Sequence, residues 1–253
     1  MLIYYLVVFF IIGICMGSFY NVVGYRLPNG MSLVKPSSHC PNCNHKLKPL
    51  ELIPVFSYLF LGAKCYACKQ KIAVFYPLME LLTGILFALS YFIFGLSYEL
   101  IIALMIASLF VIIIVSDFKY YIINDEVLIF ALLLISVIIG INQGIIELGY
   151  SLLNGLIVFA SVYLFMLFGN FIFKKDSMGG GDIKLMGLIG VTVGLFNSLI
   201  IFVMSAFLAL PFAILCLIKD KNHVIPYGPF IALSYLIVYF LQADFLEIIL
   251  NLY

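Results

Sequence analysis

The sequence predicts an all-α polytopic membrane protein with about eight transmembrane helices and one small polar insert that carries four cysteines. Of its 253 residues, 65% are hydrophobic and only 10% are charged, and long uncharged runs separate the charges. An ordinary soluble domain is roughly half apolar and about a quarter charged. Because a fold of this size cannot bury so much apolar surface, the composition excludes a soluble enzyme and a disordered protein. The net charge of +1 argues against a nucleic-acid-binding protein.

Long uncharged runs mark the expected spans, because about 20 apolar residues are needed to cross a hydrocarbon core of roughly 30 Å. The run Leu185–Ile218 is too long for one upright span. Inside it, Gly194-Leu195-Phe196-Asn197-Ser198 predicts a tight turn between two shorter helices. With this division the sequence predicts eight spans. The runs are Met1–Tyr25, Leu81–Tyr98, Leu100–Ser116, Val127–Ile146, Leu148–Phe173, Leu185–Ile218 and Asn222–Ala243.

The distribution of charge predicts how these spans are oriented. Threading eight spans through a bilayer places all 13 Lys and Arg residues on one face. A single span at Leu185–Ile218 would move Lys219 and Lys221 to the other face. Because the basic face is cytoplasmic by the positive-inside rule, we expect a multi-pass protein of the cytoplasmic membrane with both termini outside. The outer face would carry Glu99, Glu147, Asp244 and Glu247.

The spans and the insert predict three domains. Residues 1–23 would form an anchor helix, residues 24–75 a cytoplasmic insert, and residues 76–253 a membrane domain of seven helices. The first run is interpreted as an anchor and not as a cleavable signal peptide, because the basic residues follow it. The insert is rich in Lys, Pro, Asn and Ser, and it is too small to bury a good core alone.

Two CxxC pairs in the insert predict a zinc site. Cys40-Pro-Asn-Cys43 and Cys65-Tyr-Ala-Cys68 are spaced as in tetrahedral sites with four thiolate ligands. Each pair forms a turn that directs two thiolates at one point, and the metal joins the two turns. Zinc would therefore supply the folding energy that a small hydrophobic core cannot.

Two disulfides are the alternative interpretation of the insert, but the reducing cytoplasm disfavours them. His39 and His45 flank the first pair and are alternative metal ligands, although surface histidines are the simpler interpretation. Cys15 and Cys216 stand inside apolar runs and are interpreted as small apolar fillers.

Two aspartates at the ends of spans are the candidate catalytic residues, because ionisable groups in or beside a membrane span are costly and often functional. Asp117 closes an apolar run, and Asp182 follows Gly179-Gly180-Gly181 and opens the next hydrophobic segment. Both fall at the cytoplasmic ends of their helices. Two neighbouring carboxylates can share a proton, activate a water and act as general base and general acid on a peptide carbonyl. The glycines would let a substrate backbone approach Asp182 closely.

Structural roles are the alternative for each acidic residue. Asp182 could cap the following helix, and Asp117 could lie in a solvated loop and pair with Lys119. The two aspartates together, with three glycines before one of them, favour catalysis. Asp125 is interpreted as an N-terminal helix cap and Asp176 as a solvated loop residue.

These motifs resemble the type IV prepilin peptidase family, also called leader peptidase/N-methyltransferase, within the GxGD intramembrane aspartyl proteases. The resemblance covers essentially the whole chain. It departs from the family pattern at Ile123-Asn124-Asp125, where the usual proline is missing. The matching segments are Gly17 to Pro28, both cysteine pairs, Ile53-Pro54, Ser57-Tyr58, Gly62, Tyr76-Pro77, Glu80, Gly179-Gly180-Gly181-Asp182-Ile183-Lys184 and Pro226-Tyr227-Gly228-Pro229-Phe230.

The resemblance implies two activities. The first is cleavage of the basic leader from type IV prepilins or pseudopilins at the cytoplasmic membrane face, with Asp117 and Asp182 as catalytic residues. The second is methylation of the new N-terminus with S-adenosylmethionine, with the insert involved and Glu80 as a candidate for the methyl-transfer site. The family pattern also makes Gly179, Gly180, Gly181 and Lys184 supports for substrate and loop. The implied partners are prepilin substrates and the lipid bilayer.

A proton- or cation-coupled transporter is the alternative function. In it, Asp117 and Asp182 would relay charge and the insert would be a zinc-sensing gate. The charged residues gather at one face and not at the midplane, and no internal repeat is apparent, so the peptidase is favoured. A non-catalytic membrane scaffold would leave the three glycines unexplained.

Overall fold

The protein is mainly helical in the computed structural model, which describes residues 1–174, 178–219 and 225–242. These residues contain two isolated β-bridges in the insert and no β-strand. The all-α fold class is confirmed. The helices are α1 (Leu2–Arg26), α2 (Phe56–Phe60), α3 (Phe75–Phe94), α4 (Tyr98–Tyr120), α5 (Asp125–Asn142), α6 (Ile145–Phe173), α7 (Gly180–Lys219) and α8 (Gly228–Phe240), with 3-10 helices η1 (Leu27–Asn29) and η2 (Pro49–Leu52).

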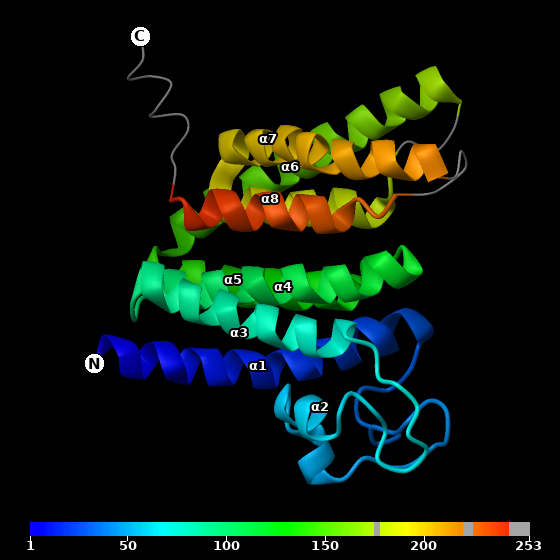
Figure 1. The fold of residues 1–253 in the computed structure, drawn as a ribbon. Helices are drawn as coiled ribbons and strands as arrows, with labels where there is room; N and C mark the ends of the chain where they lie inside the picture. Colours follow the sequence, from blue (N-terminus) through cyan, green and yellow to red (C-terminus); the bar gives the residue numbers. More distant parts are fainter. Residues whose placement is uncertain (175–177, 220–224, 243–253) are drawn as a thin grey trace. The chain divides into compact units, whose positions relative to one another are not determined.

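Among the described helices, six are long and apolar enough to cross a membrane, namely α1 and α3 to α7. The helix α8 is apolar but has 13 residues. The helix α7 is interrupted at Gly194, whose φ of 75° and ψ of 177° are non-helical, and the chain reverses direction there (Figure 1). The predicted break inside Leu185–Ile218 is therefore confirmed, at a residue type that takes positive φ without steric cost. The count of eight spans stays a prediction.

Several sequence-based predictions fall outside the described residues. They are the solvated position of Asp176, the outer-face positions of Asp244 and Glu247, the inner-face positions of Lys175 and Lys221, and the two ends of the run Asn222–Ala243.

The chain divides into two compact units, of which the first is Met1–Leu100. In this unit α1 packs along α3 with glycines at the contact. A Cβ at Gly13 would lie 2.7 Å from the Cα of Gly84, so only glycines allow the two backbones to approach this closely. Nearer the insert, the Asn21 side-chain amide donates a hydrogen bond to the backbone oxygen of Tyr76 at 3.2 Å.

The second unit is Ile101–Tyr253. Its α6 and α7 also meet at glycines, because a Cβ at Gly190 would lie 2.8 Å from the Cα of Gly155. The helix α8 is tied to α7 by a hydrogen bond of 2.6 Å, which the Tyr235 hydroxyl donates to the Thr192 hydroxyl. The boundary at Leu100 separates two units that each pack within themselves. The predicted boundary between the insert, residues 24–75, and the membrane domain, residues 76–253, is a different division and stays a prediction.

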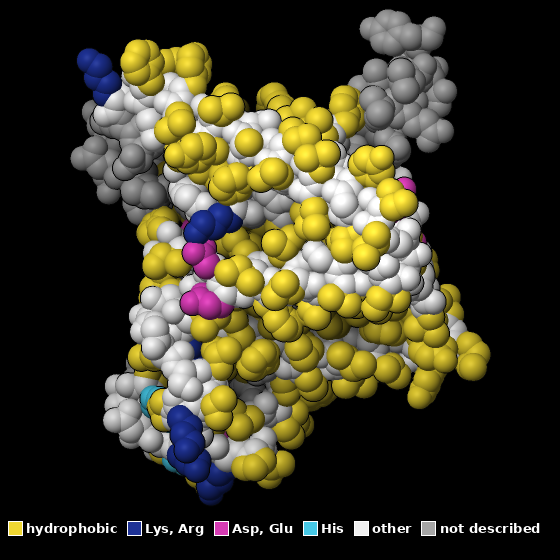
Figure 2. All heavy atoms as spheres, turned by 180° about the vertical axis from the view of Figure 1, so that it is seen from behind, with side chains coloured by type: hydrophobic (Ala, Val, Ile, Leu, Met, Phe, Trp, Pro, Cys, Tyr) yellow, Lys and Arg dark blue, Asp and Glu magenta, His cyan; other side chains and the backbone are white. Residues whose placement is uncertain are grey.

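Hydrophobic side chains cover the long sides of the helices on the face that Figure 2 shows. Ile141, Ile145 and Phe171 are each about four-fifths exposed, at 78%, 82% and 83%. A soluble monomer rarely exposes large contiguous apolar patches, whereas lipid solvates them and helices satisfy their own backbone hydrogen bonds there. The chain is a multi-pass membrane protein.

Candidate active site

Asp117 lies in the last turn of α4, and its side chain is buried. Its Oδ2 accepts a hydrogen bond of 3.0 Å from the backbone N–H of Gly228, the first residue of α8. A Cβ at Gly228 would lie 3.1 Å from this oxygen and 2.7 Å from the Cδ1 of Ile123. Glycine therefore allows the start of α8 to approach the carboxylate closely.

Asp182 is buried in the first turn of α7. The helix begins at Gly180, so Asp182 lies inside the helix and not at its N-cap. Its backbone N–H donates a hydrogen bond of 3.2 Å to the oxygen of Gly179.

The glycines before Asp182 are not equivalent. A Cβ at Gly181 would lie 2.8 Å from the Cβ of Ile123, and a Cβ at Gly179 would lie 3.1 Å from Oδ2 of Asp182. Around Gly180 there is open space. Close approach thus requires glycine at Gly181, whereas the contact at Gly179 is tight and involves only the end of the Asp182 side chain.

Ile123 joins the two halves of this site. It lies in the segment between α4 and α5, and it fills the space left open by both Gly181 and Gly228. Through these contacts the segment after Asp117 packs against the start of α7 and the start of α8. The two aspartates are close enough for their negative charges to interact.

Lys184 and Asp125 form an ion pair at the edge of this arrangement. The Lys184 Nζ lies 2.6 Å and 2.7 Å from the two carboxylate oxygens of Asp125, and both side chains are about half exposed. The interpretation of Asp125 as the helix cap is wrong, because Asn124 occupies the N-cap and Asp125 follows in the first turn. Asp125 instead connects α5 to α7.

Sequence reasoning missed the partners in this site. Ile123 carries no chemical signal, and nothing in its neighbourhood indicates that two glycines distant in sequence make room for it. Gly228 belongs to a motif that the resemblance includes, but the motif does not identify Asp117 as the acceptor of its N–H. The Lys119 ammonium, the partner considered for Asp117, lies 5.4 Å from the ring centroid of Tyr120.

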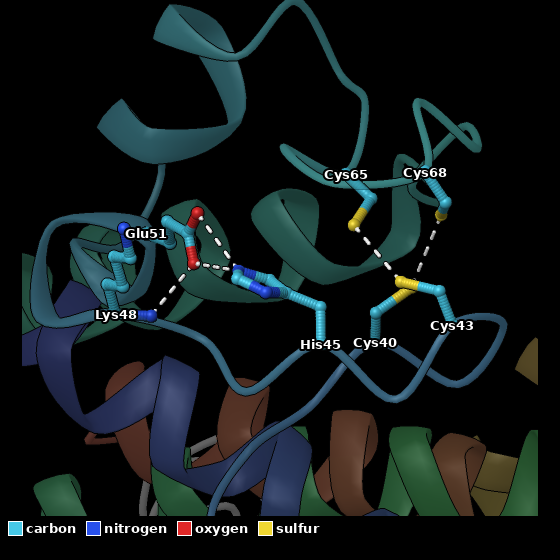
Figure 3. A network of polar contacts seen from close by, with 7 residues as sticks. All are labelled: Cys40, Cys43, His45, Lys48, Glu51, Cys65 and Cys68. Carbon is cyan, nitrogen blue, oxygen red and sulfur yellow. Dashed lines mark hydrogen bonds and ion pairs between the residues drawn. The ribbon is translucent and has the colours of Figure 1, made fainter.

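The insert contains two copies of one turn, each built on a cysteine pair (Figure 3). The backbone N–H of Cys40 donates to the oxygen of His45, and the N–H of Asn44 donates to the oxygen of Cys40. Cys65 repeats this pattern at the same spacings, with Gln70 and Lys69 as its partners. A residue with positive φ closes each turn, at 55° for Asn44 and 59° for Lys69. The predicted pair of cysteine turns is therefore present.

The four cysteine sulfurs lie within 4.8 Å of one another and could hold a metal ion. The Cys40 and Cys68 Sγ atoms are 3.8 Å apart, and the Cys43 and Cys65 Sγ atoms are 3.9 Å apart. Tetrahedral zinc with bonds of about 2.3 Å places its sulfurs about 3.8 Å apart, whereas a disulfide needs about 2.05 Å. All four cysteines are free thiols, so the geometry fits a metal and not disulfides.

Backbone donors favour the ionised form of two of these thiols, Cys40 and Cys68. The pKa of Cys68 is lowered to about 6 by the N–H of Gln70 and the Asn42 amide, and the N–H groups of Cys43 and Asn42 lower the pKa of Cys40. For Cys43, the N–H of His45 lowers the pKa, but burial and the other thiols outweigh it and raise the pKa to about 11. A divalent cation is what would allow four such close thiolates to ionise together.

The remaining histidines and cysteines lie outside this cluster. His45 Nε2 lies 3.0 Å from Oε2 of Glu51 (Figure 3), and the His39 ring nitrogen lies 3.0 Å from the oxygen of Ser37. Cys15 is exposed on α1, and Cys216 is partly exposed on α7. None of these four belongs to the described group that could hold a metal ion.

Glu80 is buried in α3, and the structure brings it against the insert. Its Oε2 accepts a hydrogen bond of 2.7 Å from the backbone N–H of Val55. Val55 has a φ of 62°, which is costly for a β-branched residue. A Cβ at Gly17 would lie 2.8 Å from the Cα of Glu80, so α1 also approaches closely here. Glu80 therefore holds a strained turn in place.

Comparisons with known proteins match both parts of the chain. Residues 11–94 match the family model of the bacterial peptidase A24 N-terminal domain, and residues 103–214 match that of the type IV leader peptidase family. The prepilin leader peptidase/N-methyltransferase of Bacillus subtilis is 34% identical over 235 residues, which are 92% of each chain. That of Vibrio cholerae is 31% identical over 93% of this chain and 96% of its own. No solved structure matches.

Proposed function

Because the chain belongs to the type IV leader peptidase family, we propose that it cleaves the basic leader from type IV prepilins or pseudopilins, with Asp117 and Asp182 as the catalytic pair. One observation carries this assignment. Two buried carboxylates from distant helix ends, α4 and α7, are brought near each other by Ile123 and its glycine contacts. Burying two like charges close together costs free energy, so such pairs are found mainly where a function requires them.

In the proposed reaction, one ionised aspartate accepts a proton from a water held between the two carboxylates. The water oxygen attacks the carbonyl carbon of the scissile peptide bond while the other, protonated aspartate donates its proton to the carbonyl oxygen. When this adduct collapses, the C–N bond breaks. The first aspartate gives the proton it took from the water to the leaving amine, and the second aspartate takes a proton back from a hydroxyl of the adduct. The open space beside Gly180 suits an extended substrate backbone near Asp182.

The proposed orientation places Asp117, Asp182 and the insert at the cytoplasmic face, with both termini outside. It is supported by the basic residues, which fall on one face when eight spans are threaded. A basic leader held at this face would lie close to anionic lipid headgroups and to the catalytic carboxylates.

We also propose that the cysteine cluster binds structural zinc through Cys40, Cys43, Cys65 and Cys68. The sulfur separations and the backbone donors support this ion. Zinc would join two turns that both lie outside the helices.

The second proposed activity is N-methylation of the cleaved substrate with S-adenosylmethionine. The names of the relatives and the match of the N-terminal family model support it. The described residues do not single out a site for this group: Glu80 already accepts the N–H of Val55, and the mostly apolar cavity of about 470 Å³ in the insert is lined by one residue of each charge, Lys48 and Glu51. We therefore derive no step of methyl transfer from this structure.

The decisive experiment is co-expression with a candidate prepilin, followed by mass measurement of the mature N-terminus. We expect loss of the leader and an added methyl group on the new N-terminal residue. An unprocessed substrate, with the protein inserted in the membrane, would contradict the proposed cleavage. Cleavage without the methyl mass would contradict the second activity only.

A further inference from the structure

The insert carries an apolar surface that no described residue of the chain covers. Its members lie on η2, α2 and the turn between them, and the most exposed are Leu50 at 78%, Leu59 at 67% and Phe60 at 86%. Six large apolar side chains in so short a segment exceed what a water-facing loop normally shows. We name this surface the apolar ledge; it consists of Leu50, Leu52, Ile53, Phe56, Leu59 and Phe60.

The ledge lies beside the transmembrane helices of its unit and not beyond their ends. The hydrogen bond from Val55 to Glu80 fixes the start of α2 against α3. At a rise of about 1.5 Å per residue, Glu80 lies about 7 Å along the axis from Phe75, where α3 begins. Figure 1 shows α2 alongside α1 and α3 at this depth. Since α1 and α3 can cross a membrane, the ledge continues their lipid-facing surface.

The charged residues around the apolar ledge indicate which lipid headgroups it would meet. Within residues 24–75, Glu51 is the only acidic residue, and the N–H of Lys48, His45 and the charge of Lys48 keep its pKa below the usual value. The ammonium groups of Lys48 and Lys69 lie over the ring of Tyr66, at 5.7 Å and 5.2 Å from its centroid. Juxtamembrane lysines of this kind attract anionic headgroups. The exposed lysines of the insert are Lys35, Lys46, Lys48, Lys64, Lys69 and Lys71.

The cavity beneath the ledge has matching chemistry. Its volume is about 470 Å³, and its lining is mostly apolar, with Ile53, Phe56 and Phe60. The charged residues in the lining are Lys48 and Glu51, and Glu51 is paired with His45. An acyl chain suits the apolar lining, and the phosphate above that chain suits the lysine. A soluble polar ligand would find few partners there.

We propose that the apolar ledge is immersed in the acyl-chain boundary of the cytoplasmic leaflet, with the lysines of the insert against anionic phospholipid headgroups. This places the cysteine cluster at the membrane surface, where a substrate N-terminus would emerge. The proposal requires that α1 and α3 cross the bilayer, and it is independent of the catalytic assignment of Asp117 and Asp182.

The chain contains no tryptophan, so one introduced tryptophan reports its own surroundings. Phe60→Trp and, as a second probe, Leu59→Trp are reconstituted in vesicles of phosphatidylcholine and phosphatidylglycerol, with or without acyl chains brominated near the headgroup end. We expect a blue-shifted emission maximum and loss of most of the emission in brominated lipid for both variants. Gln70→Trp, at the exposed tip of the second cysteine turn, is the matched control and should be quenched by aqueous iodide instead.

Equal quenching of all three variants by iodide, without quenching by brominated lipid, would overturn the proposal. Emission from the ledge that is shielded from both quenchers would also overturn it, because a protein surface would then cover the ledge. Reconstitution in phosphatidylcholine alone tests the charge argument, and the quenching of Phe60→Trp by brominated lipid should decrease there. None of these measurements depends on prepilin cleavage, so failure of the proposed function would not change them.

Discussion

The Oδ2 of Asp117 accepts a hydrogen bond of 3.0 Å from the backbone N–H of Gly228, although 111 positions separate the two residues. This bond holds the end of α4 against the start of α8. The side chain of Ile123 fills the remaining space between Gly228 and Gly181. The geometry of the proposed catalytic pair therefore depends on side chains that carry no charge as much as on the two carboxylates.

Replacing either carboxylate by its amide should abolish cleavage. Asp117→Asn and Asp182→Asn remove the general base or the general acid, and such groups contribute about 10²- to 10⁴-fold to rate. We expect at least about a 100-fold loss in the fraction of co-expressed prepilin that is processed, measured by mass spectrometry. Glu147→Gln, at an exposed residue of α6, is the control and should process normally. Full processing by either aspartate variant would refute the catalytic assignment.

Adding one methyl group at the helix contacts should also reduce cleavage. In Gly181→Ala the new Cβ would lie 2.8 Å from the Cβ of Ile123, so the segment after Asp117 must shift. In Gly228→Ala the new Cβ would lie 2.7 Å from the end of the Ile123 side chain and 3.1 Å from Oδ2 of Asp117. A small displacement of reacting groups costs about 10²-fold in rate. Initial rates of leader removal by purified protein measure this effect.

The matched control for these glycines is Gly149→Ala in α6, where a Cβ meets open space. Alanine in an open helical position is expected to be neutral or stabilising by roughly 0.5–1 kcal/mol. A loss of activity in Gly149→Ala equal to that in Gly181→Ala would show that the effect does not come from contact with Ile123.

Removing a ligand of the cysteine cluster should release zinc and loosen the insert. Cys65→Ser leaves three thiolates, and structural zinc in small domains contributes about 10–16 kcal/mol of apparent binding free energy at neutral pH. We expect loss of stoichiometric zinc in elemental analysis and a larger decrease in methylation than in cleavage. Cys15→Ser, outside the cluster, should retain the metal. Equal loss of both activities with unchanged expression would place the insert in the peptidase site.

We expect the carboxylate of Glu80 to stabilise the insert by accepting the N–H of Val55. Glu80→Gln keeps an oxygen that can accept the N–H of Val55, whereas Glu80→Ala leaves this donor without its partner, at a cost of about 1–3 kcal/mol. We expect limited proteolysis to cut the insert faster in the alanine variant only. If the glutamine variant keeps its protease resistance and still loses methylation, the carboxylate itself takes part in methyl transfer, as the family resemblance implies.

The sequence predicted the elements of this fold well, because each depends on local composition. In lipid, every backbone polar group must be satisfied within its own segment, so an uncharged apolar run forms a helix. The run Leu148–Phe173 accordingly lies in α6, and Leu100–Ser116 lies in α4. The break at Gly194 and the two cysteine turns were also predictable, since both are signalled by residue types at fixed short spacings.

What the sequence by itself determined is therefore the helical fold class with its long apolar helices, the four grouped cysteines and the placement of two aspartates near helix ends. The tertiary structure alone decided that Asp117 bonds to Gly228, that Ile123 packs on Gly181, that Asp125 pairs with Lys184 and that Glu80 holds Val55. These partners stand far apart along the chain and share no periodicity. Helix packing in a membrane is selected by small residues and close fit, and such fit leaves no pattern until the helices meet.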